Sequence, residues 1–325
     1  MDIKNIDKLI NNEIIPVIIY NKLPSNYKIQ KQNNNIKIAM NEFVENNKQI
    51  KNKYHLYLNE FISKLKKHFK HCNFDNFCNN VTTIKFIEKN SKIKGFLTFA
   101  SYFTRDNKIE IYNDEDSLYL NHELLHMASN KKINKKLIIT GFGMIDFKKR
   151  KKYGIFINEG YTEHLNRKYF YPNAIVGNQI PTYRTQVKFV QNIEKIIGEY
   201  LMQQMYFNAD LKGLINELIK YKNTKEEVLE FIINTDIMHE CRFSINPLKR
   251  LKLKRAAIKV NAFLVKSYYV KLLNDNLTHK NIVKEMTNFM NGLVDIDIDF
   301  KSNYYYMDKV RNYYDKEIAK KTKRL

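Results

Sequence analysis

The sequence predicts an α+β protein that is mostly helical and carries a small sheet. Apolar residues recur every three to four positions through most of the chain, which is the spacing of an amphipathic helix. Between about residues 80 and 112 the apolar residues alternate instead, which favours short strands. Glycine and proline number only 9 and 5 among 325 residues, and this scarcity argues against a turn-dense all-β fold.

The first 75 or so residues are predicted to be helical. A stripe of apolar side chains runs through residues 54–65, with lysines on the other side of the helix. Pro24 and the polar stretch 30–35 are expected to divide this helical region in two.

The alternating stretch predicts a small antiparallel or mixed sheet. Its last strand places Ile109 and Ile111 on one face, and the polar residues 104–107 before it suit a hairpin turn. Three strands are expected, over residues 81–88, 95–103 and 108–112.

Helices resume after the strands. Asp114, Asp116 and Ser117 suit the N-terminus of a helix over 114–130. Residues 137–157 are expected to form a loop or hairpin. Further helices are predicted over 157–170, 184–206, 209–222, 224–240, 247–275, 279–292 and 303–320. The chain is thereby divided into a helical N-terminal region, a central region and a helical C-terminal domain, over residues 1–78, 79–180 and 181–325.

The formal net charge of +22 raises the question of a nucleic-acid partner. Lysine far outnumbers arginine, however, whereas base and phosphate recognition favours the arginine fork. We therefore expect no nucleic acid as the main partner. The basic run 249–255 suits a patch for nucleic acid or an anionic membrane, or a core helix with a solvated lysine face, and the last interpretation is preferred.

The sequence gives few signs of compartment. No signal peptide is recognisable, and the longest early apolar run, 14–20, is too short to span a bilayer and contains Pro16. We expect a cytoplasmic protein without a transmembrane segment, and export by a route without a signal stays open. The oligomeric state cannot be predicted.

The segment 121–126 contains the pattern HExxH. On a helix, His122 and His126 lie on one face about one turn apart, so both imidazoles can bind one metal ion. Glu123 follows the first histidine and can reach a water on that ion. Two ligands, a general base and an open coordination position are what a zinc hydrolase requires.

A third protein ligand is needed, and residues 157–164 offer candidates. Glu159 and Glu163 are four residues apart and share a helix face. One of them can bind the metal while the other accepts the remaining N–H of a ligand histidine. His164 is an alternative third ligand, although its offset places it on another face.

The pattern HELLH followed by NEGYTE resembles that of the gluzincin superfamily of zinc metallopeptidases, HExxH followed by NExxxD or NExxxE. The resemblance covers about residues 96–165. It implies that His122, His126 and Glu159 bind one Zn²⁺ per chain, that Glu123 is the catalytic base, and that Glu163 orients a ligand histidine.

The resemblance also implies an architecture. Gluzincins pack a small sheet on the HExxH helix, and an edge strand of that sheet pairs with the extended substrate. Residues 95–103 are the candidate edge strand. Such enzymes usually take a further donor for the oxyanion from a His or Tyr in the C-terminal part. His239 is the first candidate for this catalytic role, with Tyr161 and Tyr183 as rivals.

The predicted function is therefore zinc-dependent hydrolysis of peptide bonds in a peptide or protein substrate. Two alternatives stay open. One is a zinc aminopeptidase, since the triplet Asn-Glu-Gly resembles that branch, although its upstream GxMEN motif is missing here. The other is a basic helical binding protein whose HExxH is incidental or inactive. The sequence does not indicate cleavage specificity or whether the cleft is latent.

Overall fold

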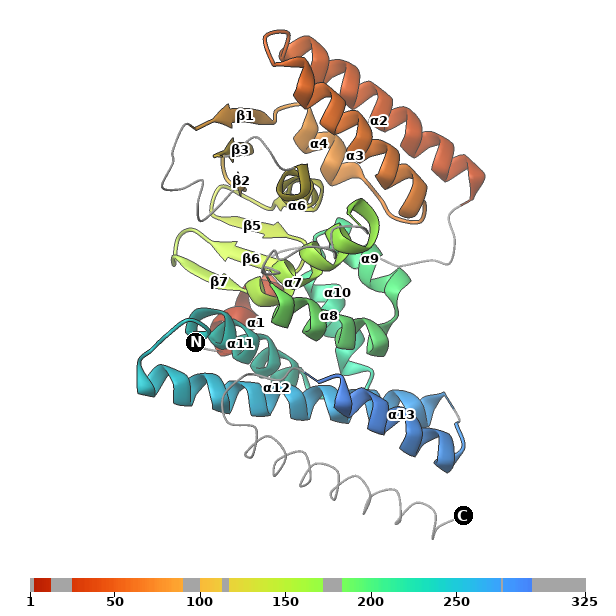
Figure 1. The fold of residues 1–325 in the computed structure, drawn as a ribbon, viewed down its shortest axis with the longest axis vertical. Coiled ribbons are helices and arrows are strands. Elements are labelled where there is room, and N and C mark those ends of the chain that lie inside the picture. Colours follow the sequence, from red (N-terminus) through yellow and green to blue (C-terminus); the bar gives the residue numbers. More distant parts are fainter. Residues whose placement is uncertain are drawn as a thin grey trace.

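The computed structural model describes residues 3–12, 25–89, 100–112, 117–171, 183–275 and 277–293. Their architecture is α+β and mostly helical, as predicted, and it contains two small sheets (Figure 1). The helices α6 (Ser117–Ala128) and α7 (Ile155–Leu165) lie in the middle of the molecule, between the helices formed by residues 26–81 and those formed by residues 225–291.

The N-terminal helices differ from the prediction at one point. α2 runs without interruption through residues 30–35, so the expected break there is wrong; Pro24 lies outside the described residues. Burial of Ile36, Ala39 and Phe43 on one face of α2 outweighs the weak helix propensity of the polar run. The helices are α1 (Ile3–Asn12), α2 (Asn26–Asn46), α3 (Asn52–His68) and α4 (Asp75–Val81).

The first sheet has the mixed pairing that the sequence allowed. Its strands are β1 (Lys85–Glu88), β2 (Ala100–Phe103) and β3 (Lys108–Ile111), in the order β1-β3-β2. β1 is parallel to β3, and β2 is antiparallel to it through the predicted turn at 104–107. Among the described strands, β2 lies at an edge of this sheet, and it contacts α6.

The second sheet is larger than the hairpin expected over residues 137–157. It is an antiparallel meander of β4 (Asn130–Lys132), β5 (Leu137–Thr140), β6 (Gly143–Asp146) and β7 (Lys151–Tyr153). β5 and β6 form the hairpin, whose turn needs Gly141 because φ there is +52° and a Cβ would lie 2.4 Å from Asn158 Oδ1. β4 and β7 are three-residue strands rich in lysine, and such strands lack the alternation that identifies a strand.

The later helices follow the predicted order, and α7 continues into the π-helix η1 (Asn166–Phe170). The helix expected over 184–206 is divided at Gly198, whose φ of +101° ends α8. The predicted helix 303–320 lies outside the described residues. The C-terminal helices are α8 (Arg184–Ile197), α9 (Glu199–Phe207), α10 (Leu211–Ile219), α11 (Lys225–Cys241), α12 (Pro247–Asn274) and α13 (His279–Asn291).

Buried apolar side chains from Ile6 to Leu293 form one connected core. α11 contacts α1, α7 and α12, so packing extends across the predicted boundary at residue 181. The division into three regions stays a prediction. In the described part of the chain, no helix is both long and apolar enough to cross a membrane.

We expect Gly160→Ala to destabilise the fold, because Gly160 brings α7 against α8. A Cβ there would lie 2.6 Å from the backbone oxygen of Gln186, so α8 would have to move. The clash outweighs the gain in helix propensity, and the free energy of unfolding should fall by about 1–3 kcal/mol in urea titrations. Gly292→Ala is the control, since its Cβ meets nothing closer than 3.5 Å. Equal midpoints for both variants would contradict the close packing of α7 on α8.

Candidate metal centre

The two histidines of HExxH lie on one face of α6, as their spacing requires. Both side chains are buried, and His122 Nε2 lies 3.1 Å from His126 Nε2. Glu159 reaches them from α7, with its Oε2 atom 3.4 Å from His122 Nε2 and 3.5 Å from His126 Nε2. The structure thus brings together the three residues that the sequence proposed as metal ligands.

The spacing of these three donor atoms fits a zinc ion. A tetrahedral zinc with bonds of about 2.0–2.2 Å separates its ligand atoms by about 3.3–3.5 Å, close to the observed distances. All three atoms lie within 4.8 Å of one another, and no other group of His, Cys, Asp or Glu in the described ranges meets this condition. Two imidazoles and a carboxylate are also a donor set that zinc prefers.

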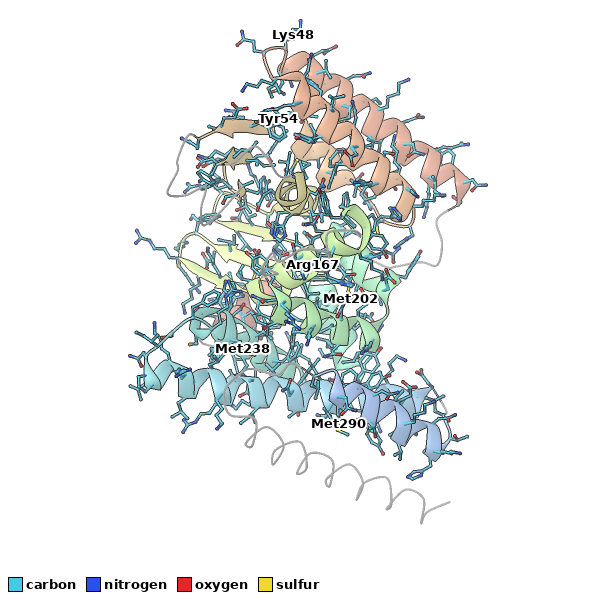
Figure 2. All side chains as sticks on the ribbon, in the orientation of Figure 1. Lys48, Tyr54, Arg167, Met202, Met238 and Met290 are labelled. Atoms are coloured by element: carbon cyan, nitrogen blue, oxygen red, sulfur yellow. The ribbon has the colours of Figure 1, made fainter. Side chains whose placement is uncertain are left out.

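Glu163 contacts the outer side of His122. Its Oε2 atom lies 2.9 Å from His122 Nδ1, and its Oε1 atom accepts a hydrogen bond of 2.6 Å from Arg167 Nε. Arg167 lies near the middle of the molecule in Figure 2. The contact between Glu163 and His122 favours the proton of the neutral imidazole on Nδ1, which leaves the lone pair of His122 Nε2 for a metal. The structure thus contains a contact between Glu163 and His122, and the role of Glu163 in orienting a metal ligand stays a prediction. Arg167 is an addition that its spacing of four residues from Glu163 could have indicated.

His126 is held by a hydroxyl network that the sequence did not reveal. Its Nδ1 atom lies 3.4 Å from Thr162 Oγ1 and 3.3 Å from Asn158 Nδ2. Thr162 donates to the backbone oxygen of Asn158, and its Oγ1 atom lies 2.7 Å from the hydroxyl of Tyr206. The Thr162 oxygen can accept a proton from His126 Nδ1, whereas the amide N–H of Asn158 can only donate to an unprotonated Nδ1. These contacts hold the ring without selecting its tautomer. Tyr206 comes from α9, and only the tertiary fold shows this contact.

The N-terminus of α7 is fixed by a carboxylate from α11. Asp236 accepts hydrogen bonds from the backbone N–H groups of Gly154 and Phe156, at 2.7 and 3.3 Å. These groups would otherwise be buried without partners, and a negative charge there also suits the helix dipole. Burial raises the pKa of Asp236 to about 7, although the backbone N–H groups act in the opposite direction.

The charges of the cluster support one another. Burial tends to lower the pKa of His122, but Glu159 and Glu163 override it and raise that pKa to about 10. Burial likewise opposes ionisation of Glu159, yet His126 and His122 hold its pKa well below the usual range. The cluster thus combines a proton-holding imidazole with an ionised carboxylate, and a bound cation would take the place of that proton.

Glu123 borders a cavity of about 530 Å³ together with His126 and Glu159. Its Oε2 atom accepts a hydrogen bond of 2.6 Å from the backbone N–H of Tyr102 in β2. Burial raises the pKa of Glu123, and the two histidines counteract that effect. Residues 101–103 of β2 also line the cavity, so the edge strand and the acidic side chain face the same space.

Tyr183 lines this cavity as well, whereas His239 is not among the described residues that line it. The Tyr183 ring lies parallel to that of His122, with centroids 5.6 Å apart. Glu159 and burial raise the pKa of Tyr183, so its hydroxyl stays protonated at neutral pH. His239 lies on α11, half-buried, and its Nδ1 atom has no hydrogen-bond partner among the described residues.

Two other candidates contact Glu194 instead of the metal cluster. The hydroxyl of Tyr161 donates to Glu194 Oε2 at 3.2 Å, and His164 Nε2 lies 3.3 Å from Glu194 Oε1. Tyr161 is also completely buried. Glu194 therefore engages the polar groups of α7 that point away from His122 and His126.

Comparison with known proteins returned no match: no family model fits the sequence, and no curated protein or solved structure is significantly similar to it. The gluzincin resemblance accordingly stays a prediction from the two motifs.

We expect the purified protein to bind one zinc ion per chain, measured by elemental analysis after dialysis. Glu159→Gln should weaken zinc binding by more than the roughly 10–100-fold that is typical of losing an outer contact. Because zinc must displace a proton that His122 holds up to about pH 10, the apparent affinity should rise with pH by up to about tenfold per unit.

Glu194→Gln is the matched control for this measurement, since it alters a buried His–Glu contact that lies outside the metal cluster. Equal zinc content in Glu159→Gln and the wild-type protein would remove Glu159 from the ligand set.

Asp236 should make the stability of the fold depend on pH. Its pKa in the folded protein, about 7, lies above the ordinary value of 3.8, so its stabilising contribution is complete below 3.8 and is lost as the pH rises through 7. Between pH 5 and pH 8, the unfolding free energy of the wild-type protein should therefore decrease relative to that of Asp236→Asn. Urea titrations across this range test it, and a constant difference would contradict the raised pKa.

Proposed function

We propose that this protein is a zinc-dependent peptidase that cleaves peptide bonds within extended segments of peptide or protein substrates. One observation carries the proposal: the donor atoms of His122, His126 and Glu159 converge, and His126 and Glu159 line a cavity that Glu123 and the edge strand β2 also border. Each part of that arrangement has a use in peptide hydrolysis.

When bound, zinc supplies a Lewis acid that polarises the scissile carbonyl and lowers the pKa of a coordinated water. Glu123 is placed to accept a proton from that water and later to pass it to the leaving amine. Its burial suits this role, since burial raises the pKa of a carboxyl group towards the working pH.

The substrate backbone would lie along β2. The N–H of Tyr102 points to Glu123 and so away from β3, which leaves this edge of β2 directed at the cavity. An extended peptide can pair with such an edge through main-chain hydrogen bonds and place its scissile bond beside Glu123. Recognition of the main chain tolerates many side chains, so we expect broad sequence preference.

The packing of β2 on α6 also supports the gluzincin resemblance. In that arrangement the sheet covers the helix that bears HExxH. α7 contacts α6 in this structure and carries Glu159 and Glu163. A cytoplasmic location belongs to the same proposal.

Tyr183 is our preferred donor for the oxyanion, ahead of His239. Its side chain lines the cavity, its hydroxyl is protonated, and it lies beside His122. The guanidinium of Arg242 lies 5.4 Å from the centre of its ring and helps to fix it. A neutral hydroxyl held at this place can donate to a carbonyl oxygen as negative charge develops on it.

An aminopeptidase is the second candidate, because Asp106 also lines the cavity. A carboxylate at that place could hold the free α-amine of a substrate. Cleavage of an N-acetylated peptide as readily as its free form would exclude an obligate aminopeptidase. If Asp106 binds the amine, Asp106→Asn should slow only the cleavage of unblocked peptides.

Activity should be lost without loss of metal in Glu123→Gln. We expect a decrease in kcat/KM of about 10²–10⁴-fold on quenched fluorescent peptides, with zinc content unchanged. Tyr183→Phe should lower kcat by about 10²–10³-fold and leave KM nearly unchanged, because the donor acts mainly in the transition state.

His239→Gln is the control for Tyr183, and its kcat should stay close to that of the wild type. A larger loss in His239→Gln than in Tyr183→Phe would reverse this assignment. Full activity of Glu123→Gln would show that the observed hydrolysis does not come from this site. A protein that binds no zinc and cleaves nothing would favour a basic binding protein with an inactive HExxH.

A further inference from the structure

Four large apolar side chains are exposed together where α11 leads into α12. Phe243, Ile245, Leu248 and Leu251 are 84%, 94%, 72% and 43% exposed, and together they make up four of the ten large exposed hydrophobic side chains among the described residues. Scattered exposed apolar residues are normal, but four of them within residues 243–251 indicate an interaction surface. We name these four residues the apolar tip.

The apolar tip is not the core side of α12. Leu253, Ala256 and Val260 are buried and share one face of that helix. Leu248 and Leu251 precede them at offsets that place both on the opposite face, together with the exposed Arg255. The beginning of α12 therefore presents one apolar face to the core and another to solvent.

Cations surround the apolar tip. Lys249, Arg250 and Lys252 are exposed in the first turns of α12, and Arg242 precedes Phe243. The sequence contains no Asp or Glu from residue 241 to residue 274. Lys259 and Lys266, further along α12, pair with Glu230 and Glu227 of α11. The first turns of α12 contain cations and no carboxylate, so the surface there attracts anions.

The apolar tip lies next to the proposed cleft. The guanidinium of Arg242 lies 4.5 Å from the centre of the Phe243 ring and 5.4 Å from that of Tyr183, which lines the cavity. β7, at the end of the basic run 148–152, contacts α11 (Figure 1). A partner bound at the apolar tip would thus lie close to the mouth of the cavity.

We propose that the apolar tip inserts into the surface of an anionic phospholipid bilayer, with the cations around it on the headgroups. Aromatic and aliphatic side chains flanked by lysine and arginine are the composition that binds the boundary between headgroups and acyl chains. The cytoplasmic leaflet carries such a negative surface. This inference does not depend on the peptidase activity.

A nucleic acid fits the same surface less well. It would use the cations, but Ile245, Leu248 and Leu251 are aliphatic and offer no ring for a base to stack on. Exposure of these side chains would remain unexplained by phosphate binding, whereas insertion into a bilayer removes them from water.

The test is co-sedimentation of the full chain with vesicles of phosphatidylcholine alone or with about one-third phosphatidylserine. We expect binding to the anionic vesicles at least about tenfold tighter than to the neutral ones, and weaker binding at high salt. The triple variant Phe243→Ser/Ile245→Ser/Leu248→Ser should lose at least about tenfold in binding, since the apolar contact is gone. Its melting temperature should not change, because these side chains are exposed.

The matched control is Ile38→Ser/Leu56→Ser, which removes side chains that are 64% and 68% exposed on α2 and α3. This variant should bind the vesicles like the wild type. Several results would overturn the proposal: no binding to anionic vesicles, full binding by the triple variant, or an equal loss in the control. Duplex DNA that binds the triple variant and the wild type equally, without vesicle binding, would assign the surface to nucleic acid instead.

Discussion

The contact between α6 and α7 decides whether this protein can hold a metal ion, because each helix carries part of the donor set. His122 and His126 come from α6, and Glu159 and Glu163 come from α7. The four side chains are charged or polar and largely buried, so each depends on the others for its charge state. A shift of α7 by one residue would separate them. The surroundings prevent such a shift: Asp236 fixes the beginning of α7, and Gly160 allows α8 to pack directly on its backbone.

The local pattern of the sequence was sufficient to predict which residues form the centre of the candidate site. A spacing of four residues on a helix places two side chains on one face, so the pairs His122–His126 and Glu159–Glu163 follow from the chain itself. That the two pairs meet could be expected only from the resemblance, and the structure brings them together. The contacts on the outer side of His126 could not be predicted from the sequence. Tyr206 is 80 residues away from His126, and no motif around Tyr206 indicates a role at the site. The strands β4 and β7 were missed for a different reason: they are three-residue lysine-rich segments whose pairing partners define them.

Sequence spacing could not distinguish Tyr183 from His239 as the donor to the oxyanion. His239 lies in a regular helix and attracted attention by its residue type, whereas Tyr183 begins α8 with a φ of +63°. A tyrosine in the left-handed region is strained, and such residues gather at functional sites. Arg242, at the end of α11, contacts the rings of both Tyr183 and the exposed Phe243. Part of the excess positive charge, which raised the question of a nucleic-acid partner, thus lies beside exposed apolar side chains at the beginning of α12.

X-ray absorption at the zinc edge of the zinc-loaded protein tests the central claim most directly, because it reports the atoms around the metal without reference to activity. The account predicts a first shell of nitrogen and oxygen alone, at about 2.0–2.2 Å, with outer scattering from two imidazole rings. Cysteine sulfur also binds zinc, so the three free cysteines, Cys72, Cys78 and Cys241, are the alternative ligands that this measurement can detect. A sulfur shell at about 2.3 Å, or a shell with fewer than two imidazoles, would contradict the assignment of His122, His126 and Glu159 as the metal ligands.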